Sequence, residues 1–157
     1  MIIRLVCIGK TTQSYLKEGI GQYVKRLSHY ARFEYVELAD VKVSKGMSEE
    51  EVKSREAAEL MKHCRDGSYV ILFDEGGKTM DSVAFATHLE KRFHSVSKDM
   101  VFMIGGPYGF HGQIYARADE KIALSAMTFS HQMVRLIAVE QIYRAMTILR
   151  NEPYHHV

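Results

Sequence analysis

Cysteine and proline are both scarce in this chain of 157 residues, which contains two of each. Cys7 and Cys64 are too few and too far apart for a disulfide framework or a zinc site, so we expect two inert, buried thiols and a reducing, cytoplasmic location. No linker, internal repeat or low-complexity segment divides the sequence. Together with the length, this predicts a single domain over residues 1–157.

Long hydrophobic runs are also missing, since no apolar stretch approaches the roughly 20 residues that span a membrane. The opening sequence MIIRLVCIGK lacks a small-residue cleavage site, so we expect a first strand there and not a signal peptide. A large excess of charge of one sign is also missing, because the sequence has 21 Lys and Arg and 19 Asp and Glu. An RNA substrate would therefore have to be held by a few placed cations, by dimerisation or by its shape.

What the sequence does contain is an alternation of short apolar runs with stretches of helical periodicity. We expect strands at residues 2–8, 33–38, 69–73, 100–104 and 121–124, and helices at about 15–27, 48–64, 81–93, 113–118 and 131–149. The expected local signals are a cap at Thr11 or Thr12, a capping box at Ser48 and Glu51, and a turn at Asp74–Gly77. This order predicts an α/β domain with a mainly parallel sheet flanked by helices.

The last expected helix, residues 131–149, is apolar over more than half of its circumference. A surface helix of a monomer needs an apolar stripe of only about 100°. Two interpretations stay open. The helix is deeply buried, or one face meets the sheet while another meets a second subunit in a two-fold homodimer.

Three loops follow expected strands, at residues 73–77, 105–109 and 125–130. Ligands of open α/β sheets bind outside the carboxyl ends of the strands, and glycines let backbone approach them closely. The loops therefore predict a pocket. The motifs G-x-G-x-x-G, G-x-x-x-x-G-K-[ST], H-E-x-x-H, C-x-x-C and G-x-S-x-G are all missing, and His155–His156 are adjacent, so we expect no metal site.

These loops and the C-terminal segment resemble the RlmH family in order and spacing. The matching segments span nearly the whole chain: Val6–Lys10, Val70–Asp74 with Gly76–Lys78, Phe102–Gly109, Leu124–His131, Glu140–Ala145 and Asn151–His155. The resemblance implies a SPOUT-class methyltransferase that uses S-adenosylmethionine (AdoMet) to methylate N3 of a pseudouridine in 23S ribosomal RNA. It also implies a C-terminal trefoil knot, and a homodimer that binds the cofactor near its interface.

The family's cofactor contacts can be transferred to this sequence residue by residue. They fall on Leu72, Gly105, Gly106, Ser125, Ala126, Met127, Thr128, Phe129 and Ser130. Ser130 stands where the family usually has proline directly before the histidine of the third loop. Because proline fixes φ, we expect this loop to be less preorganised here.

Catalytic candidates lie at the C-terminal end: Arg144, Tyr154 and His155. The nucleophile is an imide nitrogen that must lose its proton, which nearby positive charge favours and a neutral imidazole can accept. We expect His155 to position or deprotonate the base and Tyr154 to stack on it. A solvent-facing cation is the alternative for Arg144. Arg135 lies on the opposite side of the helix, so the two arginines could share a site only across a dimer.

The small net charge predicts that the substrate is an assembled ribosome or large subunit and not free RNA. Two other functions stay open at this point. One is a SPOUT-type methyltransferase for another RNA position or atom, and the other is a non-enzymatic nucleotide-binding dimer.

Overall fold

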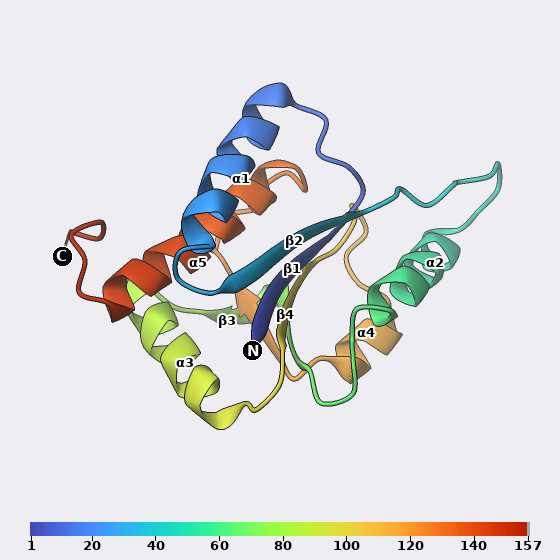
Figure 1. Cartoon of the computed structure of the whole chain (residues 1–157). Helices are drawn as coiled ribbons and strands as arrows, with labels where there is room; N and C mark the ends of the chain where they lie inside the picture. The colour runs from blue at the N-terminus through green and yellow to red at the C-terminus, as the bar shows by residue number, and fades with distance from the viewer. Residues whose placement is uncertain (157) are drawn as a thin grey trace.

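A five-stranded parallel sheet with helices on both faces makes up the computed structural model, which describes residues 1–156 (Figure 1). The strands are β1 Ile2–Ile8, β2 Arg32–Leu38, β3 Tyr69–Thr79, β4 Met100–Ile104 and β5 Glu120–Ala123. The helices are α1 Ser14–Leu27, α2 Glu49–Met61, α3 Ser82–Ser95, α4 Gly112–Arg117 and α5 Met133–Leu149. The sheet order is β2-β1-β4-β3-β5, and every neighbouring pair is parallel. The predicted α/β class is confirmed, whereas the trefoil knot stays a prediction.

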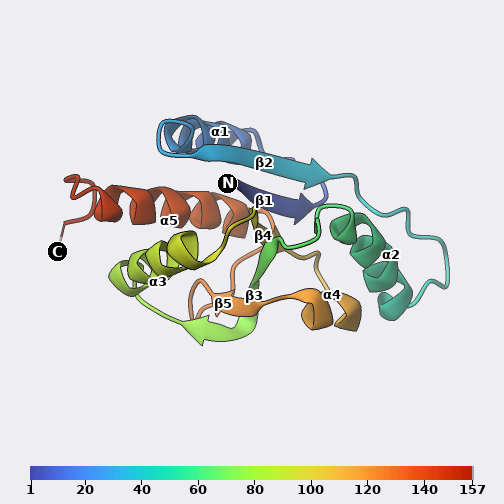
Figure 2. The same cartoon turned by 60° about the horizontal axis from the view of Figure 1, so that its bottom comes forward.

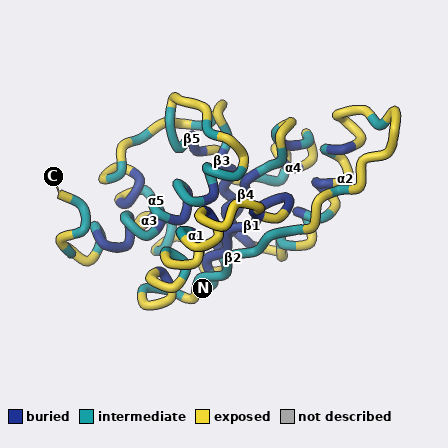
Figure 3. Tube along the Cα trace, turned by 90° about the horizontal axis from the view of Figure 1, so that it is seen from above, coloured by how far each residue is buried: buried dark blue, intermediate teal, exposed yellow. Residues whose placement is uncertain are grey.

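The helices form two layers, with α1, α3 and α5 on one face of the sheet and α2 and α4 on the other (Figure 2). Alternate residues of β1 point into the two cores: Leu5 and Cys7 into the first, and Val6 and Ile8 into the second. The central strands β1 and β4 and the first half of β3 are consequently the most deeply buried part of the sheet (Figure 3). Cys7 is fully buried, as expected, and this burial raises the pKa of its thiol to about 12.

β3 is longer than its sequence predicts, because it runs through the expected turn at Asp74–Gly77 and ends at Thr79. Its pairing with β5 changes register between Phe73 and Lys78, so the acidic and glycine residues form a bulge. A Cβ at Gly77 would lie 2.6 Å from the backbone nitrogen of Ile122, so only glycine lets the strands approach this closely. The predicted turn is therefore wrong.

Local capping signals are confirmed in one helix and wrong in another. The Ser48 hydroxyl accepts a hydrogen bond of 3.1 Å from the backbone N–H of Glu51 and so caps α2, as the capping box predicts. In α1 the N-cap is Gln13, which makes no side-chain cap, and neither threonine serves. Thr11 is buried and binds Glu37 of β2 instead.

α5 is buried on the side that faces the sheet, through Ala138, Val139, Ile142, Ala145 and Met146. Several other apolar side chains of α5 stay partly exposed, among them Met133, Ile137 and Leu149. Full burial within one chain therefore does not account for all of the apolar character of this helix, because these side chains stay partly exposed.

Candidate functional site

A cavity of about 720 Å³ lies at the carboxyl edge of the sheet, where β4 and β5 end and the bulge of β3 begins. All three loops expected to form a pocket line it, with segments 73–75, 104–110 and 123–125 together with 127–129. His131 and Val134 at the start of α5 and Glu49 at the start of α2 complete the wall. Small-molecule and cofactor sites measure roughly 300–1,000 Å³, so the cavity has a suitable size. The predicted convergence of the loops is confirmed.

Most of the predicted contact residues line this cavity: Gly105, Gly106, Ser125, Met127, Thr128 and Phe129. Leu72, Ala126 and Ser130 do not. Leu72 is fully buried in the core beneath α2 and α4, so a contact with a ligand would have to use its backbone. The sequence interpretation did not identify the wall residues Asp74, Glu75 and Tyr108, although they lie in the loops that it singled out. It gave no signal for Glu49, which belongs to a distant helix.

The second and third loops are held by their own hydrogen bonds. In the second loop, Gly109 has φ of 78° and donates its N–H to the carbonyl of Gly106 at 3.1 Å, which closes a tight turn. In the third loop, the Ser125 hydroxyl accepts from the N–H of Met127 at 2.9 Å, and the Ser130 hydroxyl accepts from the N–H of Met133 at 3.1 Å. Ser130 thus ties the end of the loop to the first residue of α5 by a hydrogen bond, where the family's proline would fix φ.

The cavity wall carries negative charge. Its acidic residues are Glu49, Asp74 and Glu75, and no Lys or Arg lines it among residues 1–156. Asp74 is oriented by the hydroxyl of Tyr115, which donates to it at 2.5 Å. Burial, followed by this bond, raises the pKa of Tyr115 to about 12, so the hydroxyl stays a donor. Such a wall suits a ligand that carries positive charge.

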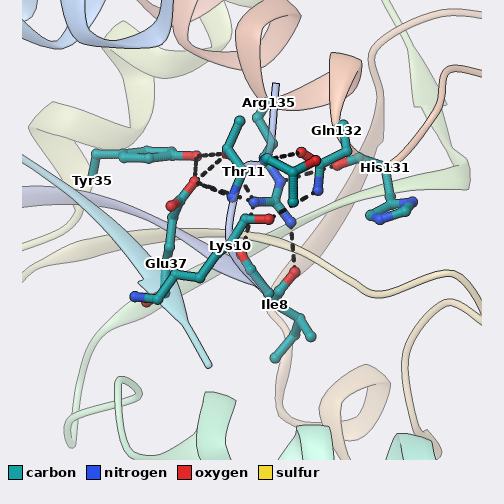
Figure 4. Close-up of polar contacts among 10 residues, drawn as sticks. Ile8, Lys10, Thr11, Tyr35, Glu37, His131, Gln132 and Arg135 are labelled. Carbon is teal, nitrogen blue, oxygen red and sulfur yellow. Dashed lines mark hydrogen bonds and ion pairs between the residues drawn. The ribbon is translucent and has the colours of Figure 1, made fainter. Parts of the chain in front are cut away.

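Arg135 ties the third loop and α5 to the end of β1 (Figure 4). Its guanidinium is fully buried and donates to the carbonyls of Gly9 at 2.8 Å and Ile8 at 2.6 Å. Nε donates to the carbonyl of His131 at 3.0 Å, and Nη1 lies 3.2 Å from a carboxylate oxygen of Glu37. With its hydrogen-bonding capacity used inside the chain, Arg135 acts as a structural anchor and is closed to any ligand or partner.

The three catalytic candidates lie together at the C-terminal half of α5, which carries Arg144, while Tyr154 and His155 follow the helix. Arg144 Nη1 is 3.0 Å from Nδ1 of His155, and the guanidinium lies over the ring of Tyr154 at 4.8 Å. The Tyr154 ring also packs edge-on against Tyr143 at 4.7 Å. The structure therefore brings together residues that the sequence could only name separately, and it docks the tail on the helix.

Glu140 is the centre of this tail cluster, and the sequence interpretation did not assign it a role. One of its carboxylate oxygens accepts from Arg144 Nη2 at 2.6 Å and from the Tyr154 hydroxyl at 2.9 Å. Burial, then Tyr23 and Glu140, raise the pKa of Tyr154. The signal that could have found Glu140 is its position four residues before Arg144, the spacing at which a helix pairs opposite charges.

The tail cluster and the cavity lie near opposite ends of α5 in one chain. Val134 lines the cavity, and Arg144 follows ten residues later, which is about 15 Å along a helix that rises 1.5 Å per residue. Figure 1 shows the C-terminal end of α5 pointing away from the carboxyl ends of the strands. A single chain therefore does not join the two halves of the predicted site.

Within residues 1–156, no group of three or more His, Cys, Asp or Glu side chains is placed to hold a metal ion. None of the helices in that part of the chain combines the length and the apolar character needed to cross a bilayer.

Taken together, a parallel sheet and a cofactor-sized cavity at its carboxyl edge define an α/β protein of the ligand-binding class. The family model described as "Predicted SPOUT methyltransferase" matches residues 1–155, and the chain belongs to this family. The family membership predicted from the sequence is thereby confirmed.

Relatives of similar length carry one common name, "Ribosomal RNA large subunit methyltransferase H". The relative from Parabacteroides distasonis is 53% identical over 156 residues, which cover 99% of each chain. The relatives from Christiangramia forsetii and Cytophaga hutchinsonii are each 49% identical over 99% of this chain and 99% and 100% of their own. The solved structure of the SpoU methyltransferase AviRb from Streptomyces viridochromogenes, in complex with AdoMet, is also similar to this chain. The alignment covers 95% of this chain and 58% of the AviRb chain, with 12% sequence identity and a TM-score of 0.46.

Proposed function

We propose that this protein is an AdoMet-dependent methyltransferase that modifies N3 of a pseudouridine in 23S ribosomal RNA, in the cytoplasm and on assembled particles. The membership of the SPOUT methyltransferase family and the name shared by full-length relatives support the reaction class and the ribosomal RNA substrate. The choice of N3 of pseudouridine rests on the resemblance to the RlmH family. The observation that carries the proposal is the single cavity wall to which all three predicted loops contribute.

The cavity suits AdoMet in both shape and charge. Its wall combines glycine backbone at Gly105–Gly106 with the hydroxyls of Ser125 and Thr128, which can bind the polar ends of the donor. The acidic side chains of the wall would favour the binding of a cation. AdoMet carries a positively charged sulfonium, which its demethylated product lacks. AdoMet supplies the methyl group, while this chain binds the donor, excludes water and holds the substrate in line with it.

A homodimer through α5 would join the two halves of the site. α5 keeps partly exposed apolar side chains, among them Met133 and Ile137, and a two-fold axis across it would set the C-terminal end of one α5 near the N-terminal end of the other. We therefore propose that Arg144, Tyr154 and His155 serve the cavity of the partner subunit. No RNA phosphate has to enter the acidic cavity in this arrangement, because only the target base needs to reach the donor.

The tail cluster consists of Glu140, Arg144, Tyr154 and His155, and its hydrogen bonds define which of these groups donates and which accepts. A guanidinium can only donate, so Nδ1 of a neutral His155 accepts from Arg144 and the ring proton lies on Nε2. His155 then positions the base by donating from Nε2, which favours positioning over deprotonation. Arg144 supplies positive charge that stabilises the imide anion, and Glu140 holds it in place. Tyr154 is engaged with Tyr143 and Arg144, so any stacking on the base would add to its docking role.

The decisive experiment combines calorimetry with a transfer assay. We expect AdoMet to bind with one site per chain, and we expect a labelled methyl group to pass to ribosomes that lack this modification. Free 23S RNA is expected to be a much poorer acceptor. Binding without transfer would point to a non-enzymatic nucleotide-binding dimer, transfer to another atom or position would change the substrate assignment, and absence of binding would contradict the proposal as a whole.

A second prediction concerns the acidic wall. Replacing Glu49 or Glu75 with glutamine is expected to weaken AdoMet binding about twofold to fivefold, as for exposed charge pairs worth 0.2–1 kcal/mol, and to affect S-adenosylhomocysteine less. Calorimetry with both ligands measures the difference. Glu51→Gln is the matched control, since it removes a charge from the same first turn of α2 outside the cavity wall. Equal losses for both ligands would show that the wall does not sense the sulfonium.

A further inference from the structure

Glu56 is a carboxylic acid on the inner side of α2, where the helix packs on the sheet. Its exposed fraction is 5%, and its neighbours on the helix face are Val52, Ala57 and Leu60. Oε1 is completely buried and has no hydrogen-bond partner in the part of the chain that the structure describes. An isolated ionised carboxylate at such a place is costly, so its presence calls for a physical explanation.

The carboxyl group of Glu56 lies directly behind the wall of the cavity, against Gly106. A Cβ at Gly106 would collide with it, since the Cβ position is 3.0 Å from Oε1 and 3.1 Å from the carboxyl carbon. Gly106 itself lines the cavity. The glycine thus leaves room for the acid at its back, and the position of the Gly105–Gly106 wall depends on the space that the Glu56 side chain fills.

The charges around Glu56 favour its uncharged form. Burial first, and the Asp40 carboxylate after β2 second, raise the pKa of Glu56 above its usual value. The nearby cationic groups are engaged elsewhere: Lys53 of α2 pairs with Glu50 at 3.2 Å, and His111 before α4 contacts Glu50 at 3.0 Å. On the next turn of α2, Glu59 pairs with Lys62 at 2.8 Å.

We propose that Glu56 is a positioning residue of the donor site, whose uncharged carboxyl group supports the Gly105–Gly106 wall and whose ionisation loosens that wall and weakens AdoMet binding. This inference rests on the proposed function of the cavity. The physical reason is that a charged carboxylate gains stability from added water or a donor, and Oε1 can reach either if α2 and the second loop move apart. AdoMet binding should then decline as the pH rises.

The same cause gives the pH dependence of stability a definite sign. Because the folded chain holds this proton more tightly than the unfolded chain, stability falls as the pH rises from the unfolded pKa through the folded pKa, and then stays level. Glu56→Gln keeps the shape without the charge, so its stability and its AdoMet affinity are expected to escape this decline.

The test is the ratio of AdoMet dissociation constants of the wild-type protein and Glu56→Gln, measured by calorimetry from about pH 5 to pH 8. The ratio is expected to rise about threefold to tenfold with pH, since one pKa unit corresponds to a tenfold change. Comparison at each pH cancels the titration of the ligand and of every group that the two proteins share. Glu59→Gln, at a partly exposed acid one turn further along α2, is the matched control and should follow the wild type at every pH.

Glu56→Ala separates support of the wall from charge alone. It removes the group behind Gly106 and is expected to weaken AdoMet binding at every pH, while unfolding curves show that each variant is folded. A ratio that stays constant with pH, or a Glu56→Ala variant that binds like the wild type, would overturn the role of Glu56. If the wild type bound no AdoMet at any pH, the proposed function would fall, and this inference with it.

Discussion

Deletion of residues 154–157 is expected to reduce methyl transfer by about 100-fold or more, because misplacing a positioning group by 1 Å already costs that much. AdoMet affinity is expected to stay within about twofold of the wild type, since none of residues 154–156 lines the cavity that would bind the donor. Single-turnover rates on ribosomes, alongside calorimetry, measure the two quantities separately. Retained turnover would remove Tyr154 and His155 from the mechanism.

Point variants refine the role of His155. His155→Ala should approach the effect of the deletion, whereas His155→Gln, which keeps an N–H donor at similar reach, should retain more activity if the ring donates from Nε2. His156→Ala is the matched control, because His156 is adjacent and exposed. If glutamine were no better than alanine while the pH profile lost its acidic limb, proton acceptance by His155 would be the better explanation.

Subunit mixing tests whether the tail serves the partner. A chain without residues 154–157 keeps its cavity, and a Gly105→Leu chain keeps its tail but fills its cavity. Neither homodimer should transfer methyl groups, yet a mixed dimer should regain one working site if the tail reaches across the interface. Failure of mixing to restore activity, with mixed dimers shown to form, would place the tail over its own cavity instead.

Arg135→Met is expected to destabilise the fold by about 3–5 kcal/mol, the usual cost of breaking a buried ion pair from one side. The substitution leaves the carbonyls of Ile8 and Gly9 and the carboxylate of Glu37 without their shared donor. Chemical denaturation measures the loss. Arg55→Met on the exposed side of α2 is the control and should change stability by less than about 0.5 kcal/mol.

The same variant should change how acid affects stability. Burial alone would raise the pKa of Glu37, but hydrogen bonds from Thr11 and Tyr35 and the charge of Arg135 outweigh it and lower the pKa. Glu37 therefore stabilises the folded chain above its usual pKa of 4.5, and this contribution is lost as the pH falls through the lowered value. In Arg135→Met, the decrease in the free energy of unfolding at acid pH should be smaller than in the wild type. An unchanged acid profile would show that Arg135 contributes packing and no charge.

The strand and helix pattern could be predicted because it depends on local periodicity. The five predicted strands and the five predicted helices are all found within residues 1–156, and their ends agree within a few residues except at the C-terminal end of β3. The errors are local signals that a tertiary partner overrides. Asp74–Gly77 has the composition of a turn, yet its pairing with β5 makes it a bulge. Thr11 has a hydroxyl that could cap a helix, yet this hydroxyl donates to the Glu37 carboxylate instead.

By itself, the sequence determined the fold class, the family and the three loops of the cavity, since these follow from residue order along single segments. Only the tertiary structure decided which side chains act together. It set Glu140 at the centre of the tail cluster, buried Arg135 as an anchor and placed the unpaired carboxyl of Glu56 behind Gly106. The physical reason is that burial and hydrogen bonding join residues up to 131 positions apart, and no local pattern encodes the distance between them.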